Sequence, residues 1–182
     1  TDPTRNIGRA AYYGYVTEIA GFKAATDKGL ILVMAAGNQG LPYAGAPGML
    51  STATDSAGNL LLGGRTIIVG GVTSSFTPQA GQNQAGHICN SVTANGSCAD
   101  LYRVKEFFVV APGMQMYASV ANQAGLKDSK GQLNTSGAIP VTGSSGATAY
   151  VSGGVALMKQ AWPQLKPEQI VSLVLNTATP MP

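Results

Sequence analysis

Three apolar runs of strand length constrain the fold of this 182-residue chain more than any other feature. They cover residues 30–36, 66–72 and 107–111. Strands that are apolar along their whole length are typical of parallel sheets that are buried on both faces. A helical pattern over 10–28 leads through Gly29, a suitable helix C-cap, directly into the first run. This order of helix, glycine, strand and loop predicts an α/β fold.

The segments between and after these runs predict less regular structure. The expected elements are a loop over 41–64 with at most a brief strand at 60–62, a short strand over 116–120, and a loop or surface hairpin over 121–142. Glycine and proline residues interrupt regular structure in the first of these segments.

Two helices close the chain. Residues 146–161 carry almost no charge before Lys159, which predicts a buried helix that ends at Trp162-Pro163. Pro167 is well placed as the first residue of a last helix, where a proline needs no N–H partner.

The composition favours one globular domain over residues 1–182 and excludes several function classes. Only 10% of the residues are charged, and the net charge of +3 is scattered, so nucleic acid is not an expected partner. No apolar run approaches the roughly 20 residues of a membrane span. The chain opens on Thr1-Asp2-Pro3 without Met, as a processed or excised piece would, so a missing signal peptide says nothing about secretion.

Two cysteines, Cys89 and Cys98, bracket a polar loop. Their spacing favours a short disulfide-closed loop, with two free thiols as the alternative. A metal site is disfavoured because the chain has one histidine, His87, and no second cysteine pair. The disulfide would stabilise the fold by roughly 2–3 kcal/mol. It would also indicate an oxidising location: secreted, periplasmic or cell-surface.

A turn rich in glycine and serine leads into the helix at 146–161. Gly143 and Gly146 bracket Ser145 and remove Cβ groups that would crowd its hydroxyl. A helix starting here places unpaired N–H groups and its positive end beside Ser145, which suits a nucleophile that must stabilise an oxyanion. The alternative is a serine that only caps a buried helix.

Three short motifs occur in the order found in one known family: Ala35-Ala36-Gly37-Asn38, Val110-Ala111-Pro112-Gly113 and Gly143-Ser144-Ser145. Together with a closing segment from Trp162-Pro163 to Ala178, they closely resemble the subtilisin-like serine proteases, the subtilases. The resemblance begins near Phe22 and covers nearly the whole chain. It implies a three-layer, mostly parallel, doubly wound sheet of subtilisin type, of which only the C-terminal part is present.

The resemblance assigns roles to individual residues. Ser145 matches the family nucleophile, and Asn38 matches the side-chain amide that donates to the oxyanion beside the backbone N–H of Ser145. The backbone of Ala35, Ala36 and Gly37 resembles one wall of the pocket for the substrate residue that precedes the scissile bond. Departures from the family pattern, such as Tyr150 in place of His, indicate a divergent branch.

The His and Asp of the family's catalytic triad precede Asn38, and this chain begins too late to hold them. His87 follows Asn38 and is interpreted as a surface-loop residue. The expected partner is therefore an N-terminal half of the same catalytic domain, and the expected substrate is a protein or peptide. Without that half the chain is expected to be inactive. The alternative is a non-catalytic subtilase-fold module that serves in binding or assembly. No cofactor or metal site is evident, and a calcium requirement is left open.

Overall fold

A computed structural model describes residues 19–55, 57–86, 103–119 and 138–180. A helical segment at 19–27 opens the described part. The elements that follow are β1 (Leu32–Ala35), α2 (Gly45–Thr52), β2 (Thr66–Val72), the 3-10 helix η1 (Arg103–Phe107), β3 (Phe108–Pro112), β4 (Met116–Ser119), β5 (Ala138–Val141), α3 (Ser144–Ala161) and α4 (Pro167–Thr177).

The three apolar runs form one parallel sheet in the order β1-β2-β3. Met34 pairs with Ile68, and Val69 pairs with Val109. All seven residues of β2 are buried, whereas the four residues of β1 are only half-buried. The predicted α/β class and parallel sheet are thus confirmed, with β2 at the centre and β1 at an open edge of the described sheet.

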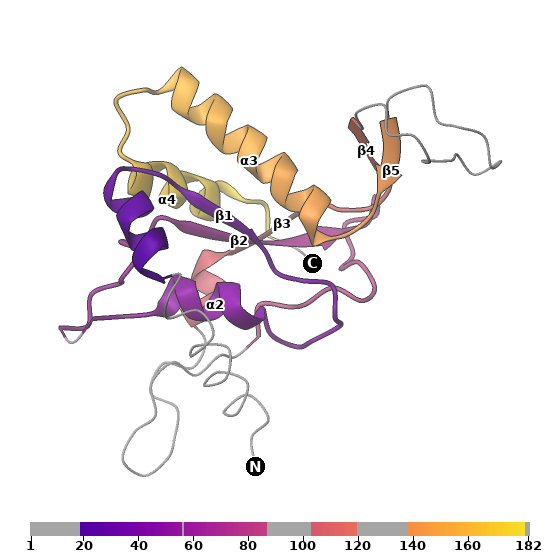
Figure 1. Cartoon of the computed structure of the whole chain (residues 1–182). Helices are drawn as coiled ribbons and strands as arrows, with labels where there is room; N and C mark the ends of the chain where they lie inside the picture. Colours follow the sequence, from indigo (N-terminus) through magenta and orange to yellow (C-terminus); the bar gives the residue numbers. More distant parts are fainter. Residues whose placement is uncertain (1–18, 56, 87–102, 120–137, 181–182) are drawn as a thin grey trace, which may run out of the picture.

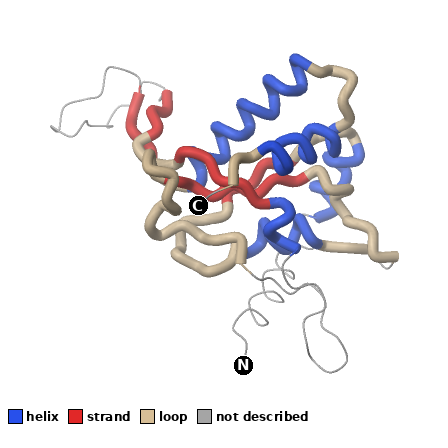
Figure 2. Tube along the Cα trace, turned by 180° about the vertical axis from the view of Figure 1, so that it is seen from behind, coloured by secondary structure: helices blue, strands red, loops and turns tan. Residues whose placement is uncertain are grey.

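Helices cover both faces of the sheet and make three layers (Figure 1; Figure 2 shows the layers from behind). The core on the α2 side contains the buried residues Ala36, Tyr43, Ala44, Met49, Ile68, Val104 and Phe107. The core under α3 and α4 contains the buried residues Ile67, Val69, Val109, Ala111, Ala147, Val155, Ile170 and Val171. Successive residues of β2 point into opposite cores, which is why residues 67–72 carry no polar side chain.

One prediction for the region between β1 and β2 is wrong. Residues 41–64 were expected to form a loop, but they contain the helix α2. Pro47 lies in its first turn, where a helix has no use for the missing N–H, so the proline does not interrupt it. Met49 and Leu50 then bury their side chains. The brief strand expected at 60–62 is reduced to a single bridge between Thr54 and Leu60.

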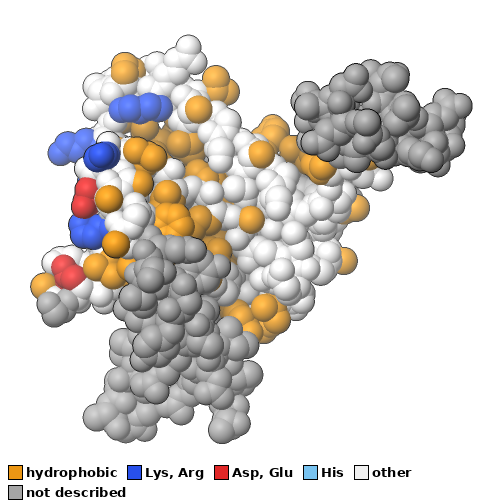
Figure 3. All heavy atoms as spheres, viewed as in Figure 1, with side chains coloured by type: hydrophobic (Ala, Val, Ile, Leu, Met, Phe, Trp, Pro, Cys, Tyr) orange, Lys and Arg blue, Asp and Glu red, His pale blue; other side chains and the backbone are white. Residues whose placement is uncertain are grey.

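The predicted burial of the long helix is also wrong for the described structure. α3 begins two residues earlier than expected, and its buried residues are Ser144, Ala147 and Val155, which lie on one face. On the opposite face Tyr150 is 61% exposed and Leu157 is 67% exposed. The low charge of α3 therefore does not reflect burial by the described residues. Figure 3 shows hydrophobic side chains gathered between α3 and the β1 side of the sheet.

The remaining local predictions agree with the structure. Gly29 ends the first helical segment at φ 91°, a conformation that favours glycine. The strand at 116–120 is β4, which pairs with β5 in an antiparallel ribbon beside the start of α3. α4 has Pro167 as its first residue. The residues Cys89, Cys98 and His87 lie outside the described residues.

Candidate active site

Three loops meet where α3 begins, beside the carboxyl ends of the parallel strands (Figure 1). The N–H of Gly143 donates to the carbonyl of Gly113 at 2.7 Å. The N–H of Gly113 in turn donates to the carbonyl of Val72 at the end of β2, at 3.0 Å. This chain of bonds fixes the turn that opens α3 to the edge of the sheet, which is the usual place for a site in an open α/β sheet.

The loop after β1 brings Asn38 to the same turn. The Ser144 N–H donates to Asn38 Oδ1 at 2.9 Å, and the Ser144 hydroxyl donates to the same oxygen at 3.1 Å. That hydroxyl also accepts the N–H of Gly37 at 3.1 Å. A backbone N–H can only donate, so the amide atom facing it must be the oxygen. Asn38 Nδ2 is therefore turned away from Ser144, and it donates to no residue that the structure describes.

The approach of Asn38 to the helix requires a glycine at position 143. Gly143 has φ 143°, a conformation that side chains rarely adopt. A Cβ built there would lie 3.0 Å from Asn38 Nδ2 and 3.3 Å from Asn38 Oδ1. Any larger residue would be strained at this φ and would crowd the Asn38 amide that bonds to Ser144.

The two neighbouring serines have different environments. Ser144 is fully buried and holds Asn38, whereas Ser145 is exposed. Gly143 is the N-cap residue of α3, so the alternative in which Ser145 caps this helix is wrong. The Ser145 N–H belongs to the first turn, where a helix leaves its donors unpaired, and it has no acceptor in the described part of the chain. An accessible hydroxyl thus stands at the positive end of an 18-residue helix.

The segment Ala35–Gly37 is held by its backbone polar groups. The Ala36 N–H donates to the carbonyl of Val69 at 2.9 Å, and the Ala36 carbonyl accepts a hydrogen bond from Asn83 Nδ2 at 2.9 Å. The Gly37 carbonyl accepts the N–H of Asn83 at 3.0 Å. These bonds fix the segment beside Asn38, while its use as a wall of a substrate pocket stays a prediction. Asn83 itself was not predicted as a functional residue, because nothing in its sequence surroundings distinguishes it.

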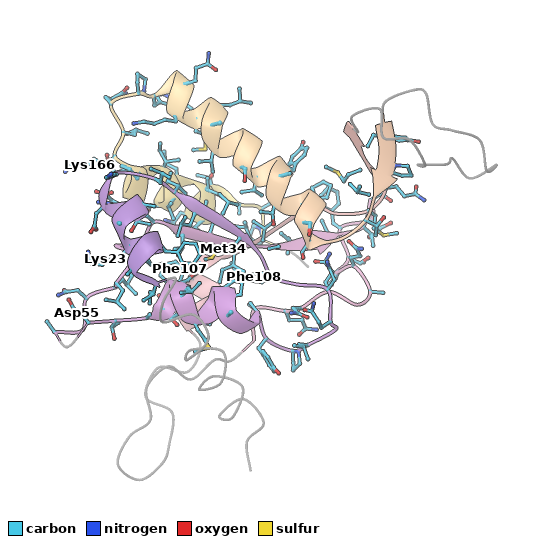
Figure 4. All side chains as sticks on the ribbon, viewed as in Figure 1. Lys23, Met34, Asp55, Phe107, Phe108 and Lys166 are labelled. Atoms are coloured by element: carbon cyan, nitrogen blue, oxygen red, sulfur yellow. The ribbon has the colours of Figure 1, made fainter. Side chains whose placement is uncertain are left out.

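The described carboxylates with shifted pKa values lie away from this turn. Hydrogen bonds from Asn59, first its backbone N–H and then its side chain, lower the pKa of Asp55. Asp55 lies in a surface turn remote from the start of α3 (Figure 4). Over the described ranges no three His, Cys, Asp or Glu side chains form a metal-binding group. No described helix is long and apolar enough to cross a membrane.

Comparisons with known proteins show which family and fold this chain shares. The sequence profile described as "Subtilase family" matches residues 4–181. Mycosin-1 of Mycobacterium tuberculosis is 36% identical over 76 residues, which are 40% of this chain and 17% of that protein. The chain thus spans less than a fifth of this curated relative.

Solved structures show the same fold. The patellamide maturation protease PatA matches with a TM-score of 0.57 at 21% identity, over 87% of this chain and 44% of that chain. The PatG macrocyclase domain matches with a TM-score of 0.59 at 21% identity, over 90% of this chain and 39% of that chain. The subtilisin-type fold expected from the sequence is therefore confirmed, and the chain spans less than half the length of these structures.

Proposed function

We propose that this chain, which belongs to the subtilase family, supplies the nucleophile and the oxyanion donors of a serine endopeptidase. The observation that carries the proposal is the position of Asn38. Its carbonyl oxygen is fixed by Ser144, so its Nδ2 is left free next to Gly143, in the turn that also carries the unpaired N–H of Ser145. Two free donors next to an exposed serine form the arrangement that acyl transfer requires.

The proposed reaction hydrolyses a peptide bond in two steps. The Ser145 hydroxyl oxygen attacks the carbonyl carbon while its proton passes to a histidine base, and the carbonyl oxygen becomes an oxyanion. That oxyanion accepts hydrogen bonds from Asn38 Nδ2 and the Ser145 N–H. The amine leaves with the proton from the histidine, and water then hydrolyses the acyl-enzyme. A neutral amide suits the donor role because it stabilises new charge without bringing a charge of its own.

The proposal needs a base from another segment. No histidine is among the described residues, and none of the described carboxylates is hydrogen-bonded to the 143–146 turn. We therefore propose that an N-terminal part of the same catalytic domain supplies the His and Asp. The chain alone is then expected to be inactive or nearly so, because the oxyanion donors by themselves leave only about 10³–10⁴-fold catalysis over water.

Two uncovered surfaces of the described structure fit such a partner. β1 pairs on one side only, so its other edge offers free N–H and carbonyl groups for a further strand. On α3, the exposed Tyr150 and Leu157 flank Gly153 and Gly154, and a Cβ at either glycine would meet nothing within 4 Å. A groove between β1 and α3 is lined by Val33, Val155 and Ile170, among others. We propose that a strand of the N-terminal part pairs with β1 while a helix packs on this face of α3.

The substrate proposed for the assembled domain is a protein or peptide. An exported location, whether secreted, periplasmic or at the cell surface, stays a prediction because it rests on Cys89 and Cys98, which lie outside the described residues.

Labelling with a fluorophosphonate tests the proposal. The catalytic domain with its N-terminal part present is treated with the probe, and the masses of intact chains and peptides are recorded. An adduct on Ser145 that Ser145→Ala abolishes is expected. Ser172→Ala, at an exposed serine on α4, serves as the matched control and leaves labelling unchanged. A correctly folded domain without an adduct would instead support the non-catalytic module.

A further inference from the structure

One buried side chain holds the whole loop that carries Asn38. Asn83 is 5% exposed, and its Oδ1 accepts the N–H of Gln39 at 3.1 Å and the N–H of Leu41 at 3.0 Å. Its Nδ2 donates to the carbonyl of Ala36 and to Gln39 Oε1, each at 2.9 Å. All four side-chain bonds end within residues 36–41.

The backbone around Asn83 continues this attachment. Its own N–H donates to the carbonyl of Gly37 at 3.0 Å. The backbone N–H of its neighbour Gln84 donates to the carbonyl of Leu41 at 3.0 Å, and the N–H of Gly40 donates to the carbonyl of Gly81 at 2.7 Å. The two residues that flank Asn38 are thus both bonded to Asn83, while the Asn38 side chain is held separately by Ser144.

The contacts also show why an asparagine fits at position 83. A side-chain amide carries an oxygen that accepts two N–H groups and, on a separate atom, two N–H donors, and Asn83 uses all four. An alanine would leave the Ala36 carbonyl and two backbone N–H groups without their partner. An aspartate would keep the acceptor but turn a carboxylate oxygen toward the Ala36 carbonyl. Gly37 completes the fit, because a Cβ there would lie 2.5 Å from Asn83 Nδ2.

We propose that Asn83 is a positioning residue for the oxyanion donor, an inference that rests on the proposed function. Asn83 fixes the backbone on both sides of Asn38, and Ser144 fixes its amide. Together they preset the direction of Nδ2 before substrate arrives. Donors held in place beforehand need no rearrangement at the moment of reaction, and this is what makes them effective.

The experiment measures fluorophosphonate labelling of Ser145 in the assembled catalytic domain for the parent, Asn38→Ala, Asn83→Ala and the double variant. The maximal labelling rate and the probe concentration for half-maximal rate are determined separately, on protein corrected for its active fraction. Removing this donor from a subtilisin costs about 10²–10³-fold, and Asn38→Ala is expected to match that loss. Asn83→Ala is expected to lower the maximal rate by about 10- to 100-fold, the cost of a displacement of about 1 Å.

The double variant distinguishes positioning from general support of the fold. If Asn83 acts through Asn38, then Asn83→Ala has no further effect in the Asn38→Ala background, and the half-maximal probe concentration stays near the parent value in all variants. An equal loss in both backgrounds would overturn the inference. So would a change in the half-maximal concentration alone. A parent domain that gives no adduct would overturn the proposed function, and the inference with it.

Two more variants keep the test decisive. Asn59→Ala removes another side-chain amide that holds a loop, by donating to Asp55 Oδ2 at 3.2 Å, and is expected to leave the labelling rate unchanged. Asn83→Asp preserves the volume and the bonds from Gln39 and Leu41 but loses both Nδ2 donations. If Asn83→Ala fails to fold, the same comparison is made with Asn83→Asp in the two Asn38 backgrounds.

Discussion

Replacing the two glycines of α3 tests where the N-terminal part packs. Gly153 and Gly154 lie in the middle of the helix, and neither has a positive φ. An added Cβ at either position would meet nothing within 4 Å in the described structure. A glycine in a helix interior costs about 0.8–1.0 kcal/mol relative to alanine. In this chain alone, the double alanine variant should therefore raise the free energy of unfolding by about 2 kcal/mol.

The same substitutions should have the opposite effect in the assembled domain. If a helix packs closely against the glycines, two added methyl groups overfill the contact at a cost of about 1–3 kcal/mol. The assay is urea denaturation of the chain alone and of the assembled domain, with and without the substitutions. Gly21→Ala is the matched control, since Gly21 is helical and its Cβ site is also open. Equal stabilisation in both contexts would refute the proposed packing on this face of α3.

Three further predictions concern single side chains. Thr66 Oγ1 is buried with no hydrogen-bond partner in the described structure. Thr66→Val should therefore raise the urea midpoint, because it removes a desolvation cost of about 1–3 kcal/mol. A lower midpoint would contradict this prediction. Hydrogen bonds lower the pKa of Glu168, first from its own backbone N–H and then from Arg65. The ionised Glu168 therefore stabilises the fold above the ordinary pKa of a glutamate, and this stabilisation is lost as the pH falls through the lowered pKa. Glu168→Gln should therefore make the urea midpoint less sensitive to pH below about 4.5, and an unchanged pH profile would contradict the assignment. Gly143→Ala should destabilise the fold by about 1–3 kcal/mol and displace Asn38. The labelling of Ser145 should therefore slow, whereas the control variant Gly21→Ala should leave the labelling rate unchanged.

The central sheet could be predicted because its signal is local. Residues 67–72 contain no polar side chain, since Ile67 and Ile68 point into two different cores and a strand buried on both faces favours apolar residues at successive positions. The start of α3 was predicted nearly as well, because the turn at Gly143 needs glycine and the helix that follows is long.

The errors have two sources: one local pattern that was misinterpreted, and contacts between residues far apart in the sequence. α2 was missed because Pro47 was interpreted as an interruption, although in the first turn of a helix it is tolerated. The low charge of α3 predicted burial, but Tyr150 and Leu157 are exposed because no described element covers them. Asn83 was missed for the same reason: its role follows from bonds to residues 36–41, more than forty positions away in the sequence.

A crystal structure of the phosphonylated catalytic domain would test the central claim most directly. If Asn38 and the Ser145 N–H form the oxyanion site, the phosphoryl oxygen of the adduct on Ser145 should lie about 2.7–3.1 Å from both Asn38 Nδ2 and the Ser145 nitrogen. Asn38 Oδ1 should keep its bond to the Ser144 N–H, now 2.9 Å. An adduct whose oxygen points to solvent, or an Asn38 amide turned away from it, would contradict the account.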